Sequence, residues 1–288
     1  MEINERQRLL ERLIAQGVLS VSPTGVPSIA DKDSVASVWI AKTMLEQIAP
    51  LDPRPKLAGQ AAGSLFEQGV GDYVEAVFPK LALVRCGNFV VGRKRRVSDF
   101  DQYEHLAEIV RLASERREIK IAFGMDYIIQ PDVVIYREPT SIKDAGLSGV
   151  KSTAYTARYT PLFAENQVRP TLHASVSCKF TLRSDRAQNA RSEALNLIRN
   201  RKGKLPHIAL VTAEPTAGRI SSLALGTGDI DCVYHIALPE LHEATRRYSA
   251  FASGSSVKSA AAGLELLETL IEGRRLRDIA DLPFDLAI

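Results

Sequence analysis

Residues 172–180 read LHASVSCKF, and this stretch alternates between apolar and polar side chains. The even-numbered residues are apolar, whereas the odd-numbered residues are His173, Ser175, Ser177 and Lys179. Successive side chains of a β-strand point to opposite faces, so the pattern predicts a strand with one face packed on a core. Lys179 would then lie on the polar face, near the end of the strand.

Strand-like and helical segments alternate along the rest of the chain. Runs rich in β-branched and aromatic residues predict further strands at 89–91, 127–136, 207–213 and 232–237. Apolar residues at helical spacing predict helices at 9–17, 34–48, 63–77, 103–114, 184–200, 240–248, 260–271 and 275–280. Ser184 is expected to cap its helix. No repeat or linker divides the chain, so we expect one α/β domain over 1–288, with a central mixed sheet flanked by helices.

Charge and composition narrow the functional classes. The 288 residues contain 37 Lys and Arg against 34 Asp and Glu, a net charge of +3. This balance argues against wholesale coating of nucleic acid, so an anionic partner would be bound by local clusters. The three cysteines, Cys86, Cys178 and Cys232, are odd in number and widely spaced, which indicates a reducing cytoplasm. No targeting segment and no apolar span of about 18 residues is present, so no membrane association is expected.

Two separated residues have the chemistry needed for phosphodiester hydrolysis. Asp132 follows Pro131 at the start of a β-branched strand, and Lys179 lies on another strand. A carboxylate can hold a hard divalent cation, and a nearby ammonium can neutralise a phosphate oxygen. Taken alone, the Pro-Asp pair is typical of a turn and the lysine of a solvated surface.

A second acidic residue is often found two positions before such a lysine in Mg²⁺ nucleases, and here that position is Ser177. Glu193, on the helix that follows the strand, is the available replacement. Its ordinary interpretation would be a solvated helical glutamate.

Basic residues gather around the start of the same helix. Arg183 and Arg186 could each bond two acceptors on guanine, and Asp185 could accept from the amino group of cytosine. The alternative is a helix end with exposed charges. Further basic residues extend the positive surface, namely Arg93, Lys94, Arg95, Arg96, Arg191, Arg199, Arg201, Lys202 and Lys204, and they predict salt-sensitive binding to phosphates.

Residues 175–234 (SVSCKFTLRSDRAQNARSEALNLIRNRKGKLPHIALVTAEPTAGRISSLALGTGDIDCVY) closely resemble the NgoMIV family of type II restriction endonucleases. The resemblance continues at 57–67 (LAGQAAGSLFE), 126–133 (DYIIQPDV) and 274–288 (RRLRDIADLPFDLAI), and so covers most of the chain. It implies a restriction-endonuclease fold, a Mg²⁺-dependent nuclease and double-stranded DNA as the partner.

The resemblance also assigns roles to residues. Asp132 would ligate Mg²⁺, Lys179 would act beside the scissile phosphate, and Glu193 would replace the acid missing at Ser177. Glu67 would belong to the metal surroundings, and the Cys178 carbonyl would be a ligand, in a site with two ions. Base recognition carries over as a set: Arg183, Asp185 and Arg186 for the inner CCGG, and Arg219 and Gln60 for the outer G·C pairs.

The implied reaction is cleavage of GCCGGC after its first G, leaving a four-base 5′ overhang. A palindromic site requires two subunits about a two-fold axis, so a homodimer is the minimum. The family implies a homotetramer that engages two DNA copies, and a partner methyltransferase that protects the host is also expected.

Two alternatives to this function remain open, and two others are disfavoured. The enzyme could cut another site that contains CCGG, or the protein could bind DNA specifically without cutting it. Gly226, Thr227 and Gly228 would suggest an unrelated nucleotide enzyme, but they lack the rest of a phosphate loop and fit a turn better. Zinc catalysis is disfavoured because His235 and His242 lack the spacing of a metal pair.

Overall fold

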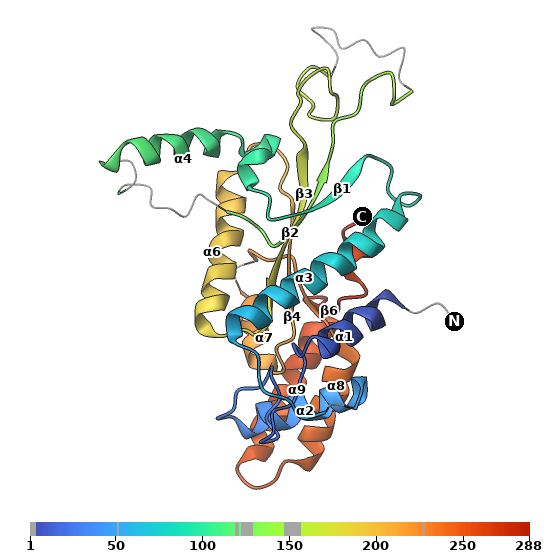
Figure 1. Cartoon of the computed structure of the whole chain (residues 1–288), viewed down its shortest axis with the longest axis vertical. Coiled ribbons are helices and arrows are strands. Elements are labelled where there is room, and N and C mark those ends of the chain that lie inside the picture. Colours follow the sequence, from blue (N-terminus) through green and yellow to red (C-terminus); the bar gives the residue numbers. More distant parts are fainter. Residues whose placement is uncertain (1–3, 51, 119–120, 122–128, 147–156, 227) are drawn as a thin grey trace.

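A six-stranded mixed sheet forms the centre of the protein in this computed structural model, which describes residues 4–50, 52–118, 121, 129–146, 157–226 and 228–288 (Figure 1). The strands are β1 (Phe89–Arg93), β2 (Val133–Arg137), β3 (Thr171–Lys179), β4 (His207–Thr212), β5 (Cys232–His235) and β6 (Leu276–Asp278). They lie in sequential order, antiparallel from β1 to β3 and parallel from β3 to β6. The expected mixed sheet is therefore confirmed.

Helices surround this sheet. They are α1 (Glu5–Ala15), α2 (Val35–Ile48), α3 (Gly59–Val77), α4 (His105–Glu115), α6 (Ser184–Asn200), α7 (Ala217–Ala224), α8 (Leu238–Phe251), α9 (Ser256–Glu272) and α10 (Leu282–Asp285). Short 3-10 turns lie at η1 (Phe78–Leu81), η2 (Val97–Asp99) and η3 (Asp101–Tyr103). No helix among the described residues is both long and apolar enough to cross a membrane.

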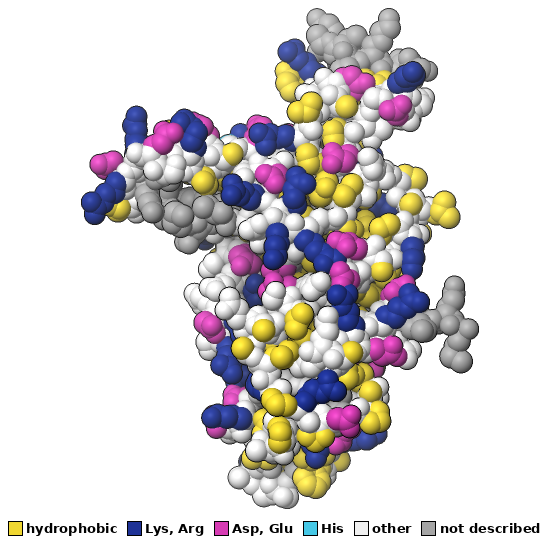
Figure 2. All heavy atoms as spheres, in the orientation of Figure 1, with side chains coloured by type: hydrophobic (Ala, Val, Ile, Leu, Met, Phe, Trp, Pro, Cys, Tyr) yellow, Lys and Arg dark blue, Asp and Glu magenta, His cyan; other side chains and the backbone are white. Residues whose placement is uncertain are grey.

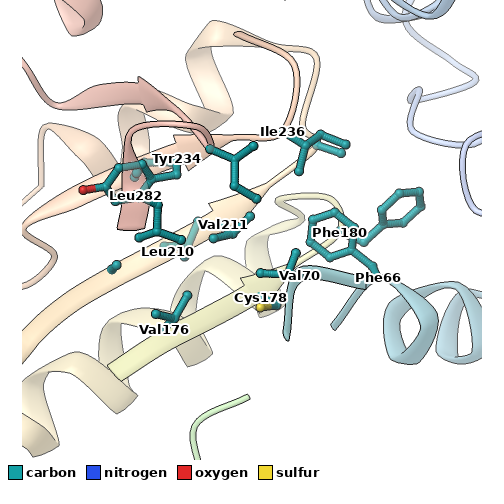
Figure 3. Close-up of a cluster of buried hydrophobic side chains, with 14 of the residues drawn as sticks. Phe66, Val70, Val176, Cys178, Phe180, Leu210, Val211, Tyr234, Ile236 and Leu282 are labelled. Atoms are coloured by element: carbon teal, nitrogen blue, oxygen red, sulfur yellow. The ribbon is translucent and has the colours of Figure 1, made fainter. Parts of the chain in front are cut away.

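β3 is one of the two middle strands, and helices cover both of its faces. On one face, Phe66 of α3 packs against Phe180, with ring centroids 5.4 Å apart, and Val70 lies beside Cys178 (Figure 3). On the other face, α6 buries Ala190, Ala194 and Leu197. The face expected to be polar is therefore largely covered at Ser175, which exposes only 5% of its surface. His173 is also buried, but it lies at a register shift between β2 and β3 and packs on the Phe89 ring.

The first helix of the chain is tied to elements much later in the sequence. α1 packs on α3, and its apolar residues Leu9, Leu10 and Leu13 are buried. Its Arg6 donates to Glu240 (2.6 Å) at the start of α8 and to Asp278 (2.8 Å) in β6. The Arg6 side chain is only 16% exposed, so this pair of contacts is largely shielded from solvent.

Several sequence-based boundaries were wrong. Residues 275–280 were expected to be helical, but Leu276–Asp278 form β6, which pairs with β5 from Val233 to His235. The strand expected at 127–136 begins only at Val133, and residues 127 and 128 lie outside the described part.

Three helix predictions also need correction. α3 begins at Gly59, so Gly63 lies inside it rather than before it. Arg183 is the N-cap of α6 and Ser184 its first residue, with no side-chain capping hydrogen bond. α7 was not predicted.

Candidate active site

Asp132 and Lys179 lie together at one end of the β2–β3 pair. Because these strands are antiparallel, the start of β2 lies beside the end of β3, where Val133 pairs with Val176. The Lys179 Nζ is 3.7 Å from Asp132 Oδ2, and the two side chains are 17% and 19% exposed. The same Oδ2 accepts a hydrogen bond from the Cys178 N–H (2.6 Å), which fixes the carboxylate against β3. The pair expected from sequence is thus in contact.

Glu193 reaches the same cluster from α6. Its Oε1 lies 3.9 Å from Lys179 Nζ, and its Oε2 accepts a hydrogen bond from Ser177 Oγ (3.2 Å). Ser177 and Lys179 share the face of β3 over which α6 packs, because they are two residues apart. Ser177 therefore supplies no acid itself but hydrogen-bonds the glutamate that lies beside Lys179.

The pKa values of the acids reflect this crowding. Burial raises the pKa of Glu193, and the neighbouring Asp132 carboxylate adds to the effect, while Lys179 and the Ser177 hydroxyl partly oppose it. Burial also raises the pKa of Glu67 on α3, with Asp132 and Glu193 contributing, against Lys179 and Lys94. A bound cation would relieve the repulsion between these carboxylates in their half-buried site.

Glu67 and Cys178 lie at the edge of this cluster. Within the described residues Glu67 forms no hydrogen bond or ion pair, so it acts on the cluster only through its charge. The Cys178 thiol is buried in the core beside Val70, and burial raises its pKa (Figure 3). No group of three or more His, Cys, Asp or Glu side chains is arranged to hold a metal ion in the part of the chain that is described.

The residues expected to contact bases meet around one pocket near the start of α6. Arg183, Arg186 and Arg219 line it together with Asp31 and Lys56. Arg186 donates to Thr181 Oγ1 (3.1 Å), which steadies one guanidinium. The structure thus brings three of the five predicted residues to one place.

The other two predicted residues flank this pocket. Gln60 is exposed and follows Gly59, a lining residue whose Cα faces the Arg186 guanidinium. Asp185 is exposed in the first turn of α6, beyond the pocket lining. The five predicted residues therefore share one region of the surface but not one pocket.

Two acidic residues that the sequence analysis missed hold Arg219. Its Nη2 contacts Asp31 Oδ2, and its Nη1 lies 3.7 Å from Glu214 Oε2. Glu214 is fully buried and also accepts from the Leu182 N–H (2.9 Å) and the Thr216 N–H (3.2 Å). Asp31 lies in no periodic pattern or motif, and although Glu214 lies within the 175–234 stretch, its spacing there did not distinguish it.

The wider basic surface is more neutralised than its sequence suggested. Arg93 pairs with Asp72 and Glu75, and Arg95 lies 3.1 Å from Asp99. On the face shown in Figure 2, Lys and Arg side chains are interspersed with Asp and Glu. No single-sign stripe is visible on that face, so phosphate binding would depend on local groups.

The zinc and nucleotide alternatives gain no support. His235 is fully buried, its Nδ1 accepts from the Ala237 N–H (3.0 Å), and burial lowers its pKa to about 4. His242 instead lies 3.2 Å from Glu268. Thr227 lies outside the described residues, and Gly228 has a positive φ of 83° before β5, as a turn requires.

Asp132 and Lys179 at the ends of neighbouring strands, with Glu193 from the next helix, have the chemistry that phosphodiester cleavage needs. This site on a mixed α/β sheet is that of a restriction endonuclease. The family model described as NgoMIV restriction enzyme matches residues 9–288. The chain is also 41% identical over 289 residues to "Type II restriction enzyme NgoMIV" of Neisseria gonorrhoeae, with 99% of this chain and 98% of the relative covered. The chain therefore belongs to the NgoMIV restriction enzyme family and is a site-specific nuclease of type II.

Two solved structures resemble the chain more distantly. The restriction endonuclease Bse634I, described as type IIF and bound to cognate DNA, gives a TM-score of 0.38 at 13% identity and covers 85% of this chain and 92% of its own. The complex of restriction endonuclease PspGI with substrate DNA gives a TM-score of 0.25 at 13% identity and covers 99% of this chain and 92% of its own. At these TM-scores the two likenesses add nothing to the family assignment.

Proposed function

We propose that this enzyme cleaves double-stranded DNA at GCCGGC, after the first G, in a Mg²⁺-dependent reaction that leaves four-base 5′ overhangs. The observation that carries the catalytic part of this proposal is the contact of Lys179 with both Asp132 and Glu193. The proposed specificity depends on the resemblance at Arg183, Asp185, Arg186, Arg219 and Gln60, of which three line one pocket. The coarser function, site-specific DNA cleavage, follows from the family.

Mg²⁺ fits the donor chemistry of the cluster. Asp132 and Glu193 offer carboxylate oxygens, which are the ligands that Mg²⁺ prefers, and their mutual repulsion would be relieved by a cation. The remaining positions would be filled by the Cys178 carbonyl, water and phosphate oxygens, because Mg²⁺ usually keeps several waters and needs no all-protein cage. Glu67 would act from further away, and a site with two ions per subunit is part of the proposal.

The chain's own residues would then position the reacting groups. When bound, the metal would lower the pKa of a water and neutralise charge on the phosphate and the leaving 3′ oxygen. Lys179 would hold the attacking water or a phosphate oxygen with its ammonium, in line with the bond that breaks. Ser177 would orient Glu193, and the Cys178 N–H would orient Asp132, so neither acid needs to move during the reaction.

Base recognition would use charged side chains around the start of α6. Arg183 and Arg186 would donate to guanines of the inner CCGG and Asp185 would accept from cytosine. Arg219, held between Asp31 and Glu214, would present its guanidinium to an outer G·C pair, with Gln60 nearby.

The whole chain would act as one domain in a cytoplasmic homotetramer, built from homodimers whose two-fold axis matches the palindrome. A cognate methyltransferase is expected beside it.

The direct test is to incubate the purified protein with plasmids that carry GCCGGC, with and without Mg²⁺, and to sequence the ends. We expect metal-dependent cuts after the first G. Cuts at another CCGG-containing site would support the proposed catalytic residues but would contradict the proposal that Arg219 and Gln60 recognise the outer G·C pairs. Specific retention of the site without any cutting would contradict the catalytic proposal and favour a DNA-binding protein that does not cleave.

A further inference from the structure

A second cluster of cations lies at the opposite end of the sheet from Asp132 and Lys179. Arg137 ends β2 beside Thr171 at the start of β3, and Lys204 lies just before β4. Both line a pocket of about 190 Å³ with Arg85. Lys179 is eight residues along β3 from Thr171, so the two sites are separated by roughly 25 Å.

No negative charge balances this pocket among the described residues that line it, since none of them is Asp or Glu. Within the described chain, neither the Arg137 guanidinium nor the Lys204 ammonium forms an ion pair or a side-chain hydrogen bond. Arg85 is less free, because its Nη1 donates to the main-chain oxygens of Ala287 (2.9 Å) and Ile288 (2.6 Å). Arg137 and Lys204 are therefore the uncompensated charges.

The two guanidiniums are held close to each other despite their like charge. Arg85 and Arg137 lie 4.9 and 5.7 Å from the centroid of the same ring, Phe89. Burial, together with the charge of Arg137, lowers the pKa of Arg85. Their Nε atoms are both buried without a hydrogen-bond partner among the described residues. Buried donors without partners are few in native proteins, and a bound ion or water is one of the explanations for them.

The neighbouring histidine does not add charge to this pocket. The His173 Nε2–H donates to the Leu286 carbonyl (2.7 Å), and burial lowers the pKa of His173 to about 4. At neutral pH the pocket thus presents guanidinium and ammonium groups beside the Thr171 hydroxyl, all of them donors. Arginine's planar fork suits oxyanions, above all phosphate, which accepts several charge-assisted hydrogen bonds at once.

We propose that Arg137 and Lys204, with Arg85, form a phosphate-binding site remote from the catalytic cluster. Its ligand is a phosphoryl group, either free inorganic phosphate or a DNA backbone phosphate outside the cleaved sequence. The site goes beyond the proposed function, because phosphate binding can be measured whether or not the enzyme cuts GCCGGC.

The test compares the full-length protein with Arg137→Gln, Lys204→Gln and the double variant. Lys258→Gln, an exposed lysine on α9 outside the pocket, is the control for loss of one positive charge. Thermal unfolding is followed as inorganic phosphate replaces chloride at constant ionic strength. A ligand that binds only the folded state raises Tm with concentration. We expect such a rise for wild type and Lys258→Gln, with phosphate affinity at least about tenfold weaker in the double variant.

A second arm identifies the source of the phosphate. Binding of a GCCGGC duplex without divalent cations is measured against salt concentration, because each lost phosphate contact lowers the salt slope by about one. A smaller slope in the double variant assigns the site to the DNA backbone, and an unchanged slope with weakened phosphate binding assigns it to free phosphate. Equal phosphate response and equal slope in wild type and double variant would overturn the proposal. If Arg137→Gln fails to fold, Lys204→Gln alone decides, since Lys204 is exposed.

Discussion

Lys179 is the residue through which the two acids of the cluster are connected, since it lies within 4 Å of both. We expect Lys179→Ala to lower the cleavage rate by at least about 100-fold, because the variant has no ammonium to stabilise the charge that develops on the phosphate. Sequence-specific DNA binding should survive. Cleavage rates and gel-shift affinities check this, with the exposed Lys42→Ala as control. Normal cleavage by Lys179→Ala would show that the active site lies elsewhere.

Glu193 makes the stability of the metal-free protein depend on pH. Its pKa is raised from 4.5 on folding by burial and by Asp132. A raised pKa means that the folded state binds the proton more tightly, so the contribution of Glu193 to stability is most favourable below pH 4.5 and falls as pH rises through the higher pKa. Glu193→Gln removes this loss, so we expect the variant to gain stability relative to wild type as pH rises from 4.5 to 8. Urea unfolding in EDTA measures the difference, and a constant difference across this range would contradict the interpretation.

Arg183 and Arg199 allow a matched comparison within one helix, because they lie at opposite ends of α6 and both are exposed. Arg183→Ala should weaken the free energy of binding to the GCCGGC duplex by about 1–3 kcal/mol, because the variant would lose one base contact. Its binding to unrelated DNA should change little. Arg199→Ala should weaken both DNAs alike, as loss of a phosphate contact does. Equal losses on both DNAs for Arg183→Ala would exclude it from base recognition.

At the residue scale, the sequence led us to expect Asp132, Lys179 and Glu193 in one cluster, but it did not indicate which acids hold Arg219. Asp132 lies at the start of a predicted strand, Lys179 lies near the end of another, and Glu193 lies on the predicted helix that follows Lys179. Asp31 and Glu214 hold Arg219 from distant segments, and only the folded chain brings them together. The mostly neutralised state of Arg93 and Arg95 likewise depends on acids that fold against them.

At the scale of elements, Glu214 links the end of β4 to two neighbouring segments. It accepts from the Leu182 N–H, just before the Arg183 cap of α6, and from Thr216, which caps α7. We expect Glu214→Ala to lower the free energy of unfolding by about 1–3 kcal/mol, because buried donors lose their acceptor. Glu214→Gln, which keeps an acceptor oxygen, should cost less. Urea unfolding tests this against the exposed Glu265→Ala, and equal effects of Glu214→Ala and Glu265→Ala would contradict the anchoring role.

The elements that sequence missed are those that tertiary contacts decide. Leu276–Asp278 is only three residues long and becomes a strand by pairing with β5, so its local helical pattern was misleading. Gly63 was taken as a helix boundary, but packing of Ala62 and Phe66 carries α3 through it. β3 itself was predicted within one residue, because a nine-residue alternation is strong local evidence.

At the scale of the whole molecule, a palindromic site calls for more than one subunit. If the proposed homotetramer is correct, we expect a light-scattering mass four times that of the 31.6 kDa chain and faster cleavage of plasmids with two GCCGGC sites than with one. Dilution below the assembly constant should remove the two-site advantage. A monomer that cuts one-site and two-site plasmids at equal rates would contradict the proposal.

The contacts of Arg6 with Glu240 and Asp278 also have a consequence for synthesis. Asp278 leaves the ribosome 272 residues after Arg6, a delay of roughly 15–50 s at ordinary elongation rates. During that time Arg6 lacks its Asp278 partner, and the sheet has not received β6. A nascent chain therefore cannot complete this arrangement before residue 278 has been synthesised, which would delay the appearance of a DNA-cutting activity inside the cell that makes it.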